Sequence, residues 1–168
     1  TAVDKAEQFP EVAYKINALA PKALAKALSF TGGKIIQIST DYVFDGIKTR
    51  PYLPNSPRNP LNIYGHSKAA AEKHIEETLC FPCQAIILRT SWLISPYGDN
   101  FVTKILKLLQ TNKEINVIND QYGALTSSSS LAKACWASIN YFEENCSNNN
   151  NIEILHWTCK GVVSWYEI

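Results

Sequence analysis

A parallel sheet is first indicated by Lys34-Ile35-Ile36-Gln37-Ile38, a short run rich in β-branched residues that leads into Ser39-Thr40-Asp41-Tyr42. Such a run, bounded by residues that favour turns, is typical of a buried strand. Gln84-Ala85-Ile86-Ile87-Leu88-Arg89 has the same character and predicts a second buried strand. The polar residues from Ser39 to Tyr42 are therefore expected just beyond the carboxyl end of a core strand.

Helical patterns lie between and around these runs. Apolar residues recur at helical spacing over 10–28, and Pro21 must disturb that helix. Asn59 and Pro60 predict the N-cap and first residue of a second helix, which ends near residue 79. We further expect a helix at 101–109, a helix at 131–142 that follows a serine cap, and a helix capped by Ser164. Short strands are expected at 115–118 and 152–157, and loops at 45–59, 95–100 and 145–151. Because strands and helices alternate at spacings that need crossovers, the chain predicts an α/β fold with a parallel sheet.

Composition narrows the function classes. The chain has 168 residues, 46% of them hydrophobic and 18% charged, which suits one folded globular core. A net charge of +1 argues against nucleic-acid binding through a strong basic field. The longest apolar runs are far shorter than the roughly 20 residues that a membrane span needs.

Five cysteines at irregular spacing argue against a disulfide framework and favour a cytoplasmic location. Cys80 and Cys83 have the spacing of a redox motif, but a thioredoxin-like site has a strand before it and a helix after it, and here the order is reversed. The three histidines show no metal-ligand spacing, so no metal site is expected. Since the chain starts at Thr1 and contains no Met, we expect it to be an internal fragment of a longer protein.

Tyr64 and Lys68 are the first candidates for chemistry. They are four residues apart in the predicted second helix, so they share one face. An ammonium beside a phenol favours the phenolate and is expected to lower the pKa of Tyr64, which would make it a general acid or base. Thr40, at the end of the first strand, would add a hydroxyl donor, and the three groups together could polarise and protonate a carbonyl. The alternatives are a surface helix pair and a turn hydroxyl that bonds its own backbone.

Two longer strings carry a family resemblance: residues 38–46, Ile-Ser-Thr-Asp-Tyr-Val-Phe-Asp-Gly, and residues 60–68, Pro-Leu-Asn-Ile-Tyr-Gly-His-Ser-Lys. With Arg89-Thr90-Ser91-Trp92, Asn119-Asp120-Gln121 and matching segments at both ends, they resemble the extended short-chain dehydrogenase/reductases, and within these the dTDP-4-dehydrorhamnose reductases. The resemblance implies a Rossmann-like doubly wound sheet and an NADPH- or NADH-dependent reduction of the C4 ketone of dTDP-4-dehydro-L-rhamnose. It also implies a nucleotide-sugar substrate, a cytoplasmic enzyme and a possible homodimer of the intact protein.

The resemblance assigns a role to each matching residue. Tyr64 would be the acid to the ketone, Thr40 would hydrogen-bond that ketone, and Lys68 would hold the nicotinamide ribose. Ser91 would also lie at the cofactor. Substrate contacts are implied for Asp41, Tyr42 and Trp92 near the sugar, and for Asn100, Phe101 and Gln121 toward the nucleotide. Residues 1–95 would complete the dinucleotide-binding domain, and 96–168 would be mainly a substrate-binding portion interleaved with the sheet.

Two features depart from the family pattern. The Gly-rich turn that cradles the cofactor pyrophosphate is missing, so it should precede Thr1 in the parent, and the isolated chain is expected to lack useful turnover. The family commonly has Pro where Leu125 stands, which concerns the rigidity of that loop.

Pro21 suggests one further site residue. Because Pro21 has no N–H, it cannot bond the carbonyl of Asn17, four residues earlier. In the wider superfamily an Asn on the corresponding helix binds a water linked to the active-site Lys, so Asn17 is a candidate for holding a proton-relay water. An ordinary proline kink with a solvated carbonyl is the alternative.

Two other functions remain open on the same fold. One is a non-catalytic regulatory subunit, like that of methionine adenosyltransferase, which resembles this chain around residues 41–46. The other is an epimerase or dehydratase. Dehydratases place an acidic pair after the strand-end Thr, whereas here Thr40 is followed by Asp41 and then Tyr42, which favours simple reduction.

Overall fold

The computed structural model describes residues 2–112, 114–145 and 152–168. The chain forms two compact units. Unit 1 consists of Thr1–Arg89 with Ala137–His156, and unit 2 of Thr90–Trp136 with Trp157–Ile168. The expected boundary after residue 95 remains a prediction, as does the substrate-binding role of 96–168.

Unit 1 opens with a broken helical stretch. It contains α1 (Val3–Gln8), which the sequence did not predict, then α2 (Pro10–Tyr14), a π-helical turn η1 (Lys15–Leu19) and α3 (Ala20–Thr31). The expectation of one helix over 10–28 is therefore corrected. Pro21 has no N–H to donate, and directly before it the Ala20 N–H bonds the carbonyl of Lys15, five residues back. The predicted disturbance by Pro21 is confirmed as this π turn.

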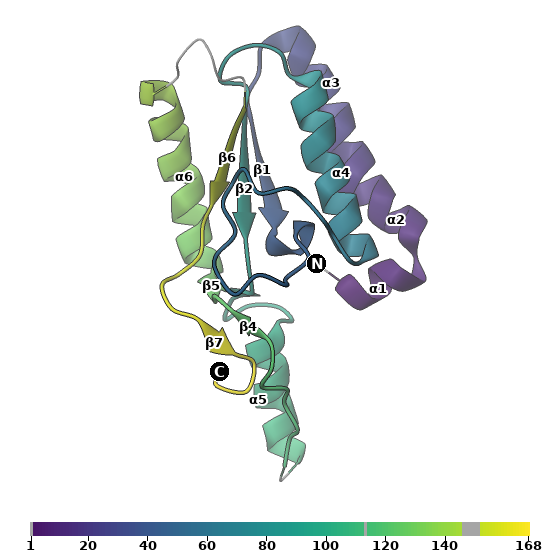
Figure 1. The fold of residues 1–168 in the computed structure, drawn as a ribbon, viewed down its shortest axis with the longest axis vertical. Coiled ribbons are helices and arrows are strands. Elements are labelled where there is room, and N and C mark those ends of the chain that lie inside the picture. The colour runs from purple at the N-terminus through teal and green to yellow at the C-terminus, as the bar shows by residue number, and fades with distance from the viewer. Residues whose placement is uncertain (1, 113, 146–151) are drawn as a thin grey trace. The chain divides into compact units, whose positions relative to one another are not determined.

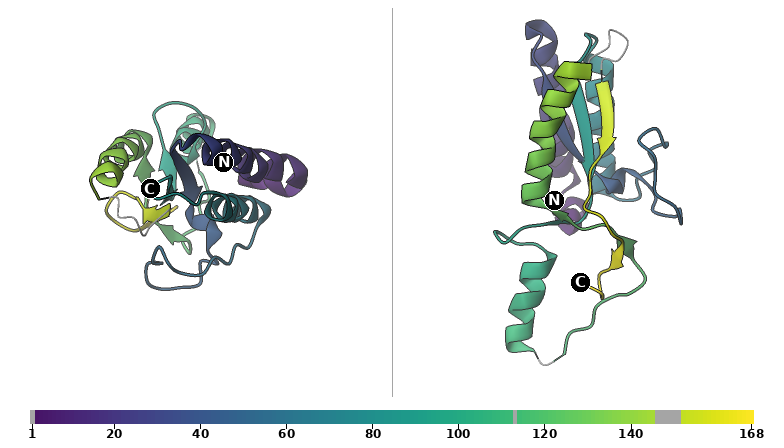
Figure 2. Two further views of the ribbon diagram at one scale, coloured as in Figure 1. Left: turned by 90° about the horizontal axis from the view of Figure 1, so that it is seen from above. Right: turned by 90° about the vertical axis from the view of Figure 1, so that its left-hand side faces the viewer.

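The sheet of unit 1 has three strands in the order β1 (Ile35–Thr40), β2 (Ala85–Thr90) and β6 (Ile152–His156). β2 and β6 are parallel, with Ile87 opposite Ile154, and the arrows of β1 and β2 point the same way in Figure 1. Figures 1 and 2 show α3 and α4 on one face of this sheet and the C-terminal half of α6 on the other. The α/β fold with a parallel sheet is thus confirmed, and both predicted strands run on to a threonine.

Helix α4 (Ile63–Thr78) is the element that carries Tyr64 and Lys68. Its N-cap is Asn62, whose Oδ1 accepts from the Gly65 N–H at 2.7 Å. The predicted cap at Asn59 is wrong, because the Asn59 N–H instead donates to the Val43 carbonyl at 2.8 Å and holds that segment outside the helix.

The core of unit 1 lies where α3 and α4 cover the sheet. Ile75 and Leu79 pack with Ala25, Ala85 and Ile87, all of them at most 1% exposed. Burying one such large aliphatic side chain contributes about 1.5–3 kcal/mol. This packing fixes α4 against the strands and so determines where the first turns of α4 lie relative to the carboxyl end of β1.

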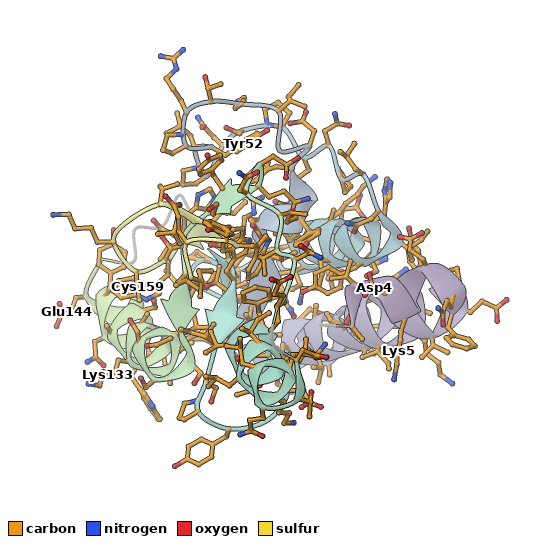
Figure 3. All side chains as sticks on the ribbon, turned by 90° about the horizontal axis from the view of Figure 1, so that it is seen from below. Asp4, Lys5, Tyr52, Lys133, Glu144 and Cys159 are labelled. Atoms are coloured by element: carbon orange, nitrogen blue, oxygen red, sulfur yellow. The ribbon has the colours of Figure 1, made fainter. Side chains whose placement is uncertain are left out.

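A short 3₁₀ turn, η2 (Asp41–Val43), follows β1 and leads into the expected loop. In that loop the Tyr52 ring stacks on Phe44 with centroids 4.3 Å apart, and the Tyr52 hydroxyl hydrogen-bonds the Asp45 carboxylate. Tyr52 is labelled on this loop in Figure 3. These contacts give the proline-rich segment a defined shape.

Unit 2 is built from short elements. These are β3 (Leu93–Ile94), α5 (Phe101–Thr111), β4 (Tyr122–Gly123), β5 (Thr126–Ser127), the first half of α6 (Ser128–Asn145) and β7 (Val163–Ser164). β3 pairs with β5 in parallel and β4 with β7 antiparallel. Helix α5 appears as predicted, and a serine caps α6, since the Ser127 hydroxyl accepts from the Ser130 N–H at 3.1 Å.

Two expectations about strand and cap in unit 2 have different outcomes. The strand expected at 115–118 is wrong: no described strand pairs with it, and a short apolar run does not by itself form a ladder. The helix expected after Ser164 is wrong, because Ser164 ends β7 and residues 165–167 form a turn. The capping hydrogen bonds are nevertheless present: the Ser164 hydroxyl accepts from the Glu167 N–H at 3.2 Å, and Glu167 Oε2 accepts from the Ser164 N–H at 2.6 Å. The loop predicted at 145–151 lies almost wholly outside the described residues.

The cysteines differ in their bonding state. Cys80, Cys135 and Cys159 are free, whereas Cys83 is disulfide-bonded, which the spacing of the cysteines did not predict. Cys80 and Cys83 are therefore not bonded to each other.

Among the described helices none is long and apolar enough to cross a membrane. The described residues contain no group of three or more His, Cys, Asp or Glu side chains that could hold a metal ion.

Candidate active site

Thr40 ends β1, and its hydroxyl is the centre of the site in unit 1. It donates to Asp41 Oδ1 at 3.0 Å and accepts from the Tyr42 N–H at 3.2 Å. The Tyr64 side chain lies near enough to Thr40 for the two hydroxyls to interact. Thr40 is buried, so these partners hold it in one orientation. Thr40 and Tyr64 thus lie beside each other at the carboxyl end of β1, and the joint site that the sequence predicts for Thr40, Tyr64 and Lys68 remains a prediction.

Tyr64 is placed by the close approach of α4 to the η2 turn. A Cβ on Gly65 would lie 2.2 Å from the Tyr42 carbonyl oxygen, so only glycine lets the two backbones meet here. The Tyr42 ring packs edge-on against the Tyr64 ring, with centroids 5.7 Å apart. Tyr42 and Asp41, both predicted site residues, therefore lie directly beside Tyr64.

The pKa of Tyr64 differs from the expectation. It is raised above its ordinary value of 10.0, chiefly because burial disfavours the phenolate, while the hydrogen bond to Thr40 opposes that effect and the charge of Asp41 adds to it. The predicted lowering by Lys68 is wrong for this chain, because the ammonium is directed to a backbone carbonyl instead. The phenol therefore stays protonated at neutral pH, but the raised pKa makes Tyr64 a weaker acid than a free tyrosine, so its position and not this shift suits it to donate a proton.

Lys68 lies one turn beyond Tyr64 on α4. Its Nζ donates to the Ile38 carbonyl of β1 at 2.5 Å. Burial lowers its pKa from the ordinary 10.5, and the nearby Glu72 carboxylate partly offsets that shift. Among the described residues this is the hydrogen bond that the structure gives Lys68, so two of its three donor positions remain for a ligand.

Asn17 lies in the π turn η1 and connects it to α4. Its Nδ2 donates to Ser67 Oγ at 3.0 Å, and Ser67 Oγ donates to the Tyr64 carbonyl at 2.7 Å. The sequence predicted a role for the Asn17 carbonyl, but it did not predict this side-chain bond to the residue before Lys68. The role of Asn17 in holding a water remains a prediction.

Glu72 and Arg89 form a buried ion pair behind Thr40 that sequence reasoning missed. Arg89 Nε and Nη2 donate to the two Glu72 oxygens at 2.9 and 2.7 Å, and Ser39 donates to the same carboxylate. Burial raises the pKa of Glu72, but hydrogen bonds from Arg89 and Ser39 and the two arginine charges leave it below its ordinary value of 4.5. The pair ties β1, α4 and β2 together beside the site.

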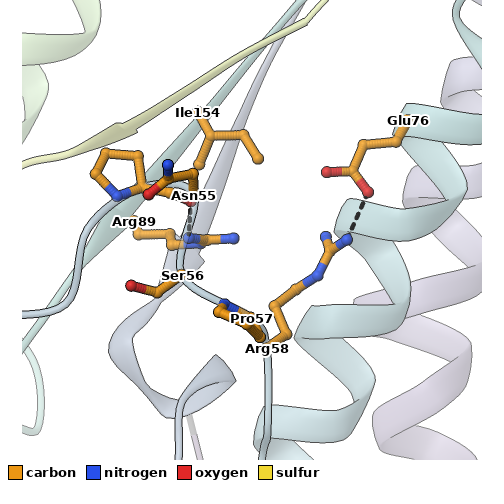
Figure 4. A pocket seen from close by; sticks show the side chains of 8 residues that line it. Asn55, Ser56, Pro57, Arg58, Glu76, Arg89 and Ile154 are labelled. Atoms are coloured by element: carbon orange, nitrogen blue, oxygen red, sulfur yellow. Dashed lines mark hydrogen bonds and ion pairs between the residues drawn. The ribbon is translucent and has the colours of Figure 1, made fainter. Parts of the chain in front are cut away.

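The same carboxylate also anchors the loop. Arg58 Nη1 donates to Glu72 at 3.1 Å and its Nη2 to Glu76 at 2.7 Å, while Arg89 Nη1 donates to the Pro54 carbonyl at 2.9 Å. Figure 4 shows Arg58, Arg89 and Glu76 around a cavity of about 270 Å³ that this loop lines. The signals in the sequence were Glu72, four residues after Lys68, and Arg89, a lone charge in an apolar strand.

The remaining predicted site residues belong to unit 2. Ser91 is buried and donates to the Ala124 carbonyl at 2.7 Å. Asn100 caps α5, with its Oδ1 accepting from the Thr103 N–H at 3.2 Å and its Nδ2 donating to the Ser95 carbonyl at 2.7 Å. Gln121 is exposed. Their contacts to cofactor or nucleotide remain predictions.

Trp92 and Phe101 form an aromatic cluster in unit 2. The Trp92 ring stacks on Trp165 with centroids 3.7 Å apart, and Phe101 lies 4.4 Å from Trp165. The cluster brings two predicted substrate residues together, and it includes one, Trp165, that the sequence analysis did not assign to the site.

The site in unit 1 fits one end of a nicotinamide cofactor. Lys68 offers unused donors suited to ribose hydroxyls, and Tyr64 and Thr40 present hydroxyls at the edge of the sheet where ligands bind in such folds. None of the described strands leads through a Gly-rich turn into a helix, so the described residues fit the nicotinamide end and not the pyrophosphate.

A parallel sheet with a Thr–Tyr–Lys group at its carboxyl edge places the chain among the Rossmann-like short-chain dehydrogenase/reductases. The chain belongs to the RmlD substrate binding domain family, whose model matches residues 1–168. The family resemblance seen in the sequence is therefore confirmed.

Relatives and solved structures agree with this assignment. The chain is 39% identical over 168 residues to a dTDP-4-dehydrorhamnose reductase of Escherichia coli K12, covering 99% of this chain and 54% of that protein. A dTDP-4-dehydrorhamnose reductase structure from Clostridium acetobutylicum matches with a TM-score of 0.88 and 40% identity, over 99% of this chain and 55% of that one. One from Bacillus anthracis in complex with NADP matches with a TM-score of 0.88 and 35% identity, over 99% and 56%. The chain thus spans about half the length of the relatives it matches.

Proposed function

We propose that the protein containing this chain reduces the C4 ketone of dTDP-4-dehydro-L-rhamnose to give dTDP-L-rhamnose. The observation that carries the proposal is the placement of the Tyr64 side chain beside Thr40 at the carboxyl end of β1, with Lys68 one helical turn away. The similarity to dTDP-4-dehydrorhamnose reductases over 99% of the chain supports the choice of substrate.

The cofactor we propose is NADPH or NADH, which supplies hydride to the ketone carbon when bound. Tyr64 holds the proton that the ketone oxygen takes up, and the positive charge of Lys68 would have to offset the raised pKa of the buried phenol. Lys68 would bind ribose hydroxyls through its free donor positions and place its positive charge one turn from the phenol.

The Thr40 hydroxyl can donate one hydrogen bond, and two neighbouring side chains, Asp41 and Tyr64, could accept it. While Tyr64 is neutral, the Thr40 hydroxyl donates to Asp41 at 3.0 Å and can accept from the phenol. Once Tyr64 has given up its proton, the same hydroxyl can turn and donate to the phenolate. The Thr40 hydroxyl could also donate to the ketone oxygen of the substrate. Such a hydrogen bond would hold that oxygen close to Tyr64.

Substrate contacts are proposed for the residues around these groups. Contacts with the sugar are proposed for Asp41, Tyr42 and Trp92, and contacts toward the nucleotide for Asn100, Phe101 and Gln121. A homodimer of the intact protein is part of the proposal, and so is a cytoplasmic location, where nucleotide sugars and reduced nicotinamides are available.

The test is an assay of the full-length protein with dTDP-4-dehydro-L-rhamnose and each reduced cofactor. We expect oxidation of NADPH or NADH that depends on the sugar and yields equimolar dTDP-L-rhamnose. Tight binding of a partner subunit together with no cofactor oxidation would instead favour the non-catalytic regulatory role. Formation of an epimerised or dehydrated sugar without net cofactor oxidation would favour the epimerase or dehydratase alternative.

A further inference from the structure

Trp92 is held in a backbone conformation that a tryptophan rarely adopts. Its φ is +41°, in the left-handed region that is unfavourable for a residue with a bulky side chain. Such strain persists only where surrounding contacts enforce it, and it is frequent at ligand-binding positions. The question is which residues of unit 2 enforce it.

Gly123 supplies the first of these contacts. A Cβ built on Gly123 would lie 2.5 Å from Trp92 Cε2, 2.7 Å from Cζ2 and 2.9 Å from Cδ2. No real Cβ sits that close to ring carbon atoms, so the indole occupies the space that any other residue at 123 would need. Gly123 belongs to β4, which pairs with Val163 of β7 and is not free to move aside.

Trp165 supplies the second contact, directly after β7. Its ring is nearly parallel to that of Trp92, with an interplanar angle of 15° and centroids 3.7 Å apart. Phe101, the first residue of α5, packs at a tilt of 50° on Trp165 and keeps that ring in place. The Trp92 carbonyl is fixed as well, because it accepts from the Thr126 N–H at 3.1 Å.

We propose that Gly123 and Trp165 are positioning residues that hold the Trp92 indole in one orientation for contact with the hexose ring of the substrate. The inference rests on the proposed function, in which Trp92 contacts the sugar. An aromatic ring that is already ordered loses no side-chain freedom when the sugar binds, so more of the contact energy appears as affinity. The strained backbone at Trp92 and the missing side chain at 123 then have one common explanation.

The packing part of the inference is tested without any substrate. In the full-length protein we expect Gly123→Ala to lower the denaturation midpoint in the wild-type background and to have little effect in a Trp92→Ala background, because the three clashing atoms are then gone. Equal losses in the two backgrounds would overturn the inference. Stacked indoles also couple their transitions, so Trp165→Leu should remove a paired positive and negative band from the circular dichroism spectrum, which Trp136→Phe, an exposed control, should leave intact.

The functional part is tested by steady-state kinetics of the same variants with dTDP-4-dehydro-L-rhamnose. We expect Trp165→Leu to raise KM for the sugar about three- to tenfold, the size of an aromatic pair contribution, with kcat and the KM for cofactor nearly unchanged. Trp136→Phe should match the wild type. If the wild-type protein reduces the sugar and Trp165→Leu shows an unchanged KM, the inference fails and the proposed function stands. If the wild-type protein does not reduce the sugar, both fail.

Discussion

Replacement of Glu72 by Gln tests the structural basis of the site in unit 1. Glu72 is fully buried, and its two oxygens accept two hydrogen bonds from Arg89, one from Arg58 and one from Ser39. A glutamine is the same size but keeps only one acceptor oxygen, and its NH₂ group would face other donors. Arg89, which is 3% exposed, would then keep its charge without a counter-charge.

The expected loss of unfolding free energy is about 3–5 kcal/mol, the cost of removing one partner from a buried ion pair. Glu76→Gln is the matched control, because it breaks only the bond to Arg58, and both of those side chains remain more than a quarter exposed. That change should cost less than about 1 kcal/mol. Urea denaturation of the full-length protein, followed by circular dichroism, measures both.

The stability contributed by Glu72 is also expected to depend on pH. The pKa of Glu72 is lowered in the folded chain, so its contribution to stability is fully present above the ordinary value of 4.5 and is lost as the pH falls through the lowered value. The difference between wild type and Glu72→Gln should therefore be large at neutral pH and shrink in acid. A Glu72→Gln variant that loses no more stability than Glu76→Gln at neutral pH would refute the reasoning.

Substitutions at three positions probe how α4 presents its side chains. Gly65→Ala places a Cβ 2.2 Å from the Tyr42 carbonyl oxygen, and we expect a loss of about 1–3 kcal/mol in denaturant unfolding. Asn62→Ala removes the N-cap and should cost about 0.5–2 kcal/mol in the same assay, whereas Asn62→Asp should keep most of the stability. Ser67→Ala leaves the Asn17 amide without its partner, so it should cost about 1–3 kcal/mol, and amide hydrogen exchange should rise in the π turn.

Much of unit 1 could be predicted from local sequence. The runs at 34–38 and 84–89 have few alternatives to buried strands, and the spacing of Tyr64 and Lys68 places both on one helix face. Pro21 predicted an interruption of the helix, because the missing N–H removes a hydrogen bond from its own helical turn whatever the tertiary context. These features depend on neighbours in the sequence, which is why they were accessible.

The rest depends on contacts between distant residues. The direction of the Tyr64 pKa shift could not be predicted, because it depends on how deeply the phenol is buried and on the Ile38 carbonyl, which accepts a hydrogen bond from the Lys68 ammonium. Residues 115–118 resemble a strand locally, but a strand exists only where a partner is in register. Trp165 joins Trp92 only through the pairing of β4 with β7, which no local pattern signals.

The central claim, that Tyr64 donates the proton in a ketone reduction, is tested most directly by Tyr64→Phe in the full-length protein. The change removes the hydroxyl and keeps the ring that packs against Tyr42. We predict that turnover of dTDP-4-dehydro-L-rhamnose falls by about 10² or more, while the Kd of the cofactor changes little. Tyr97→Phe, at an exposed tyrosine, should behave as wild type. Turnover by Tyr64→Phe close to that of the wild-type protein would contradict the account.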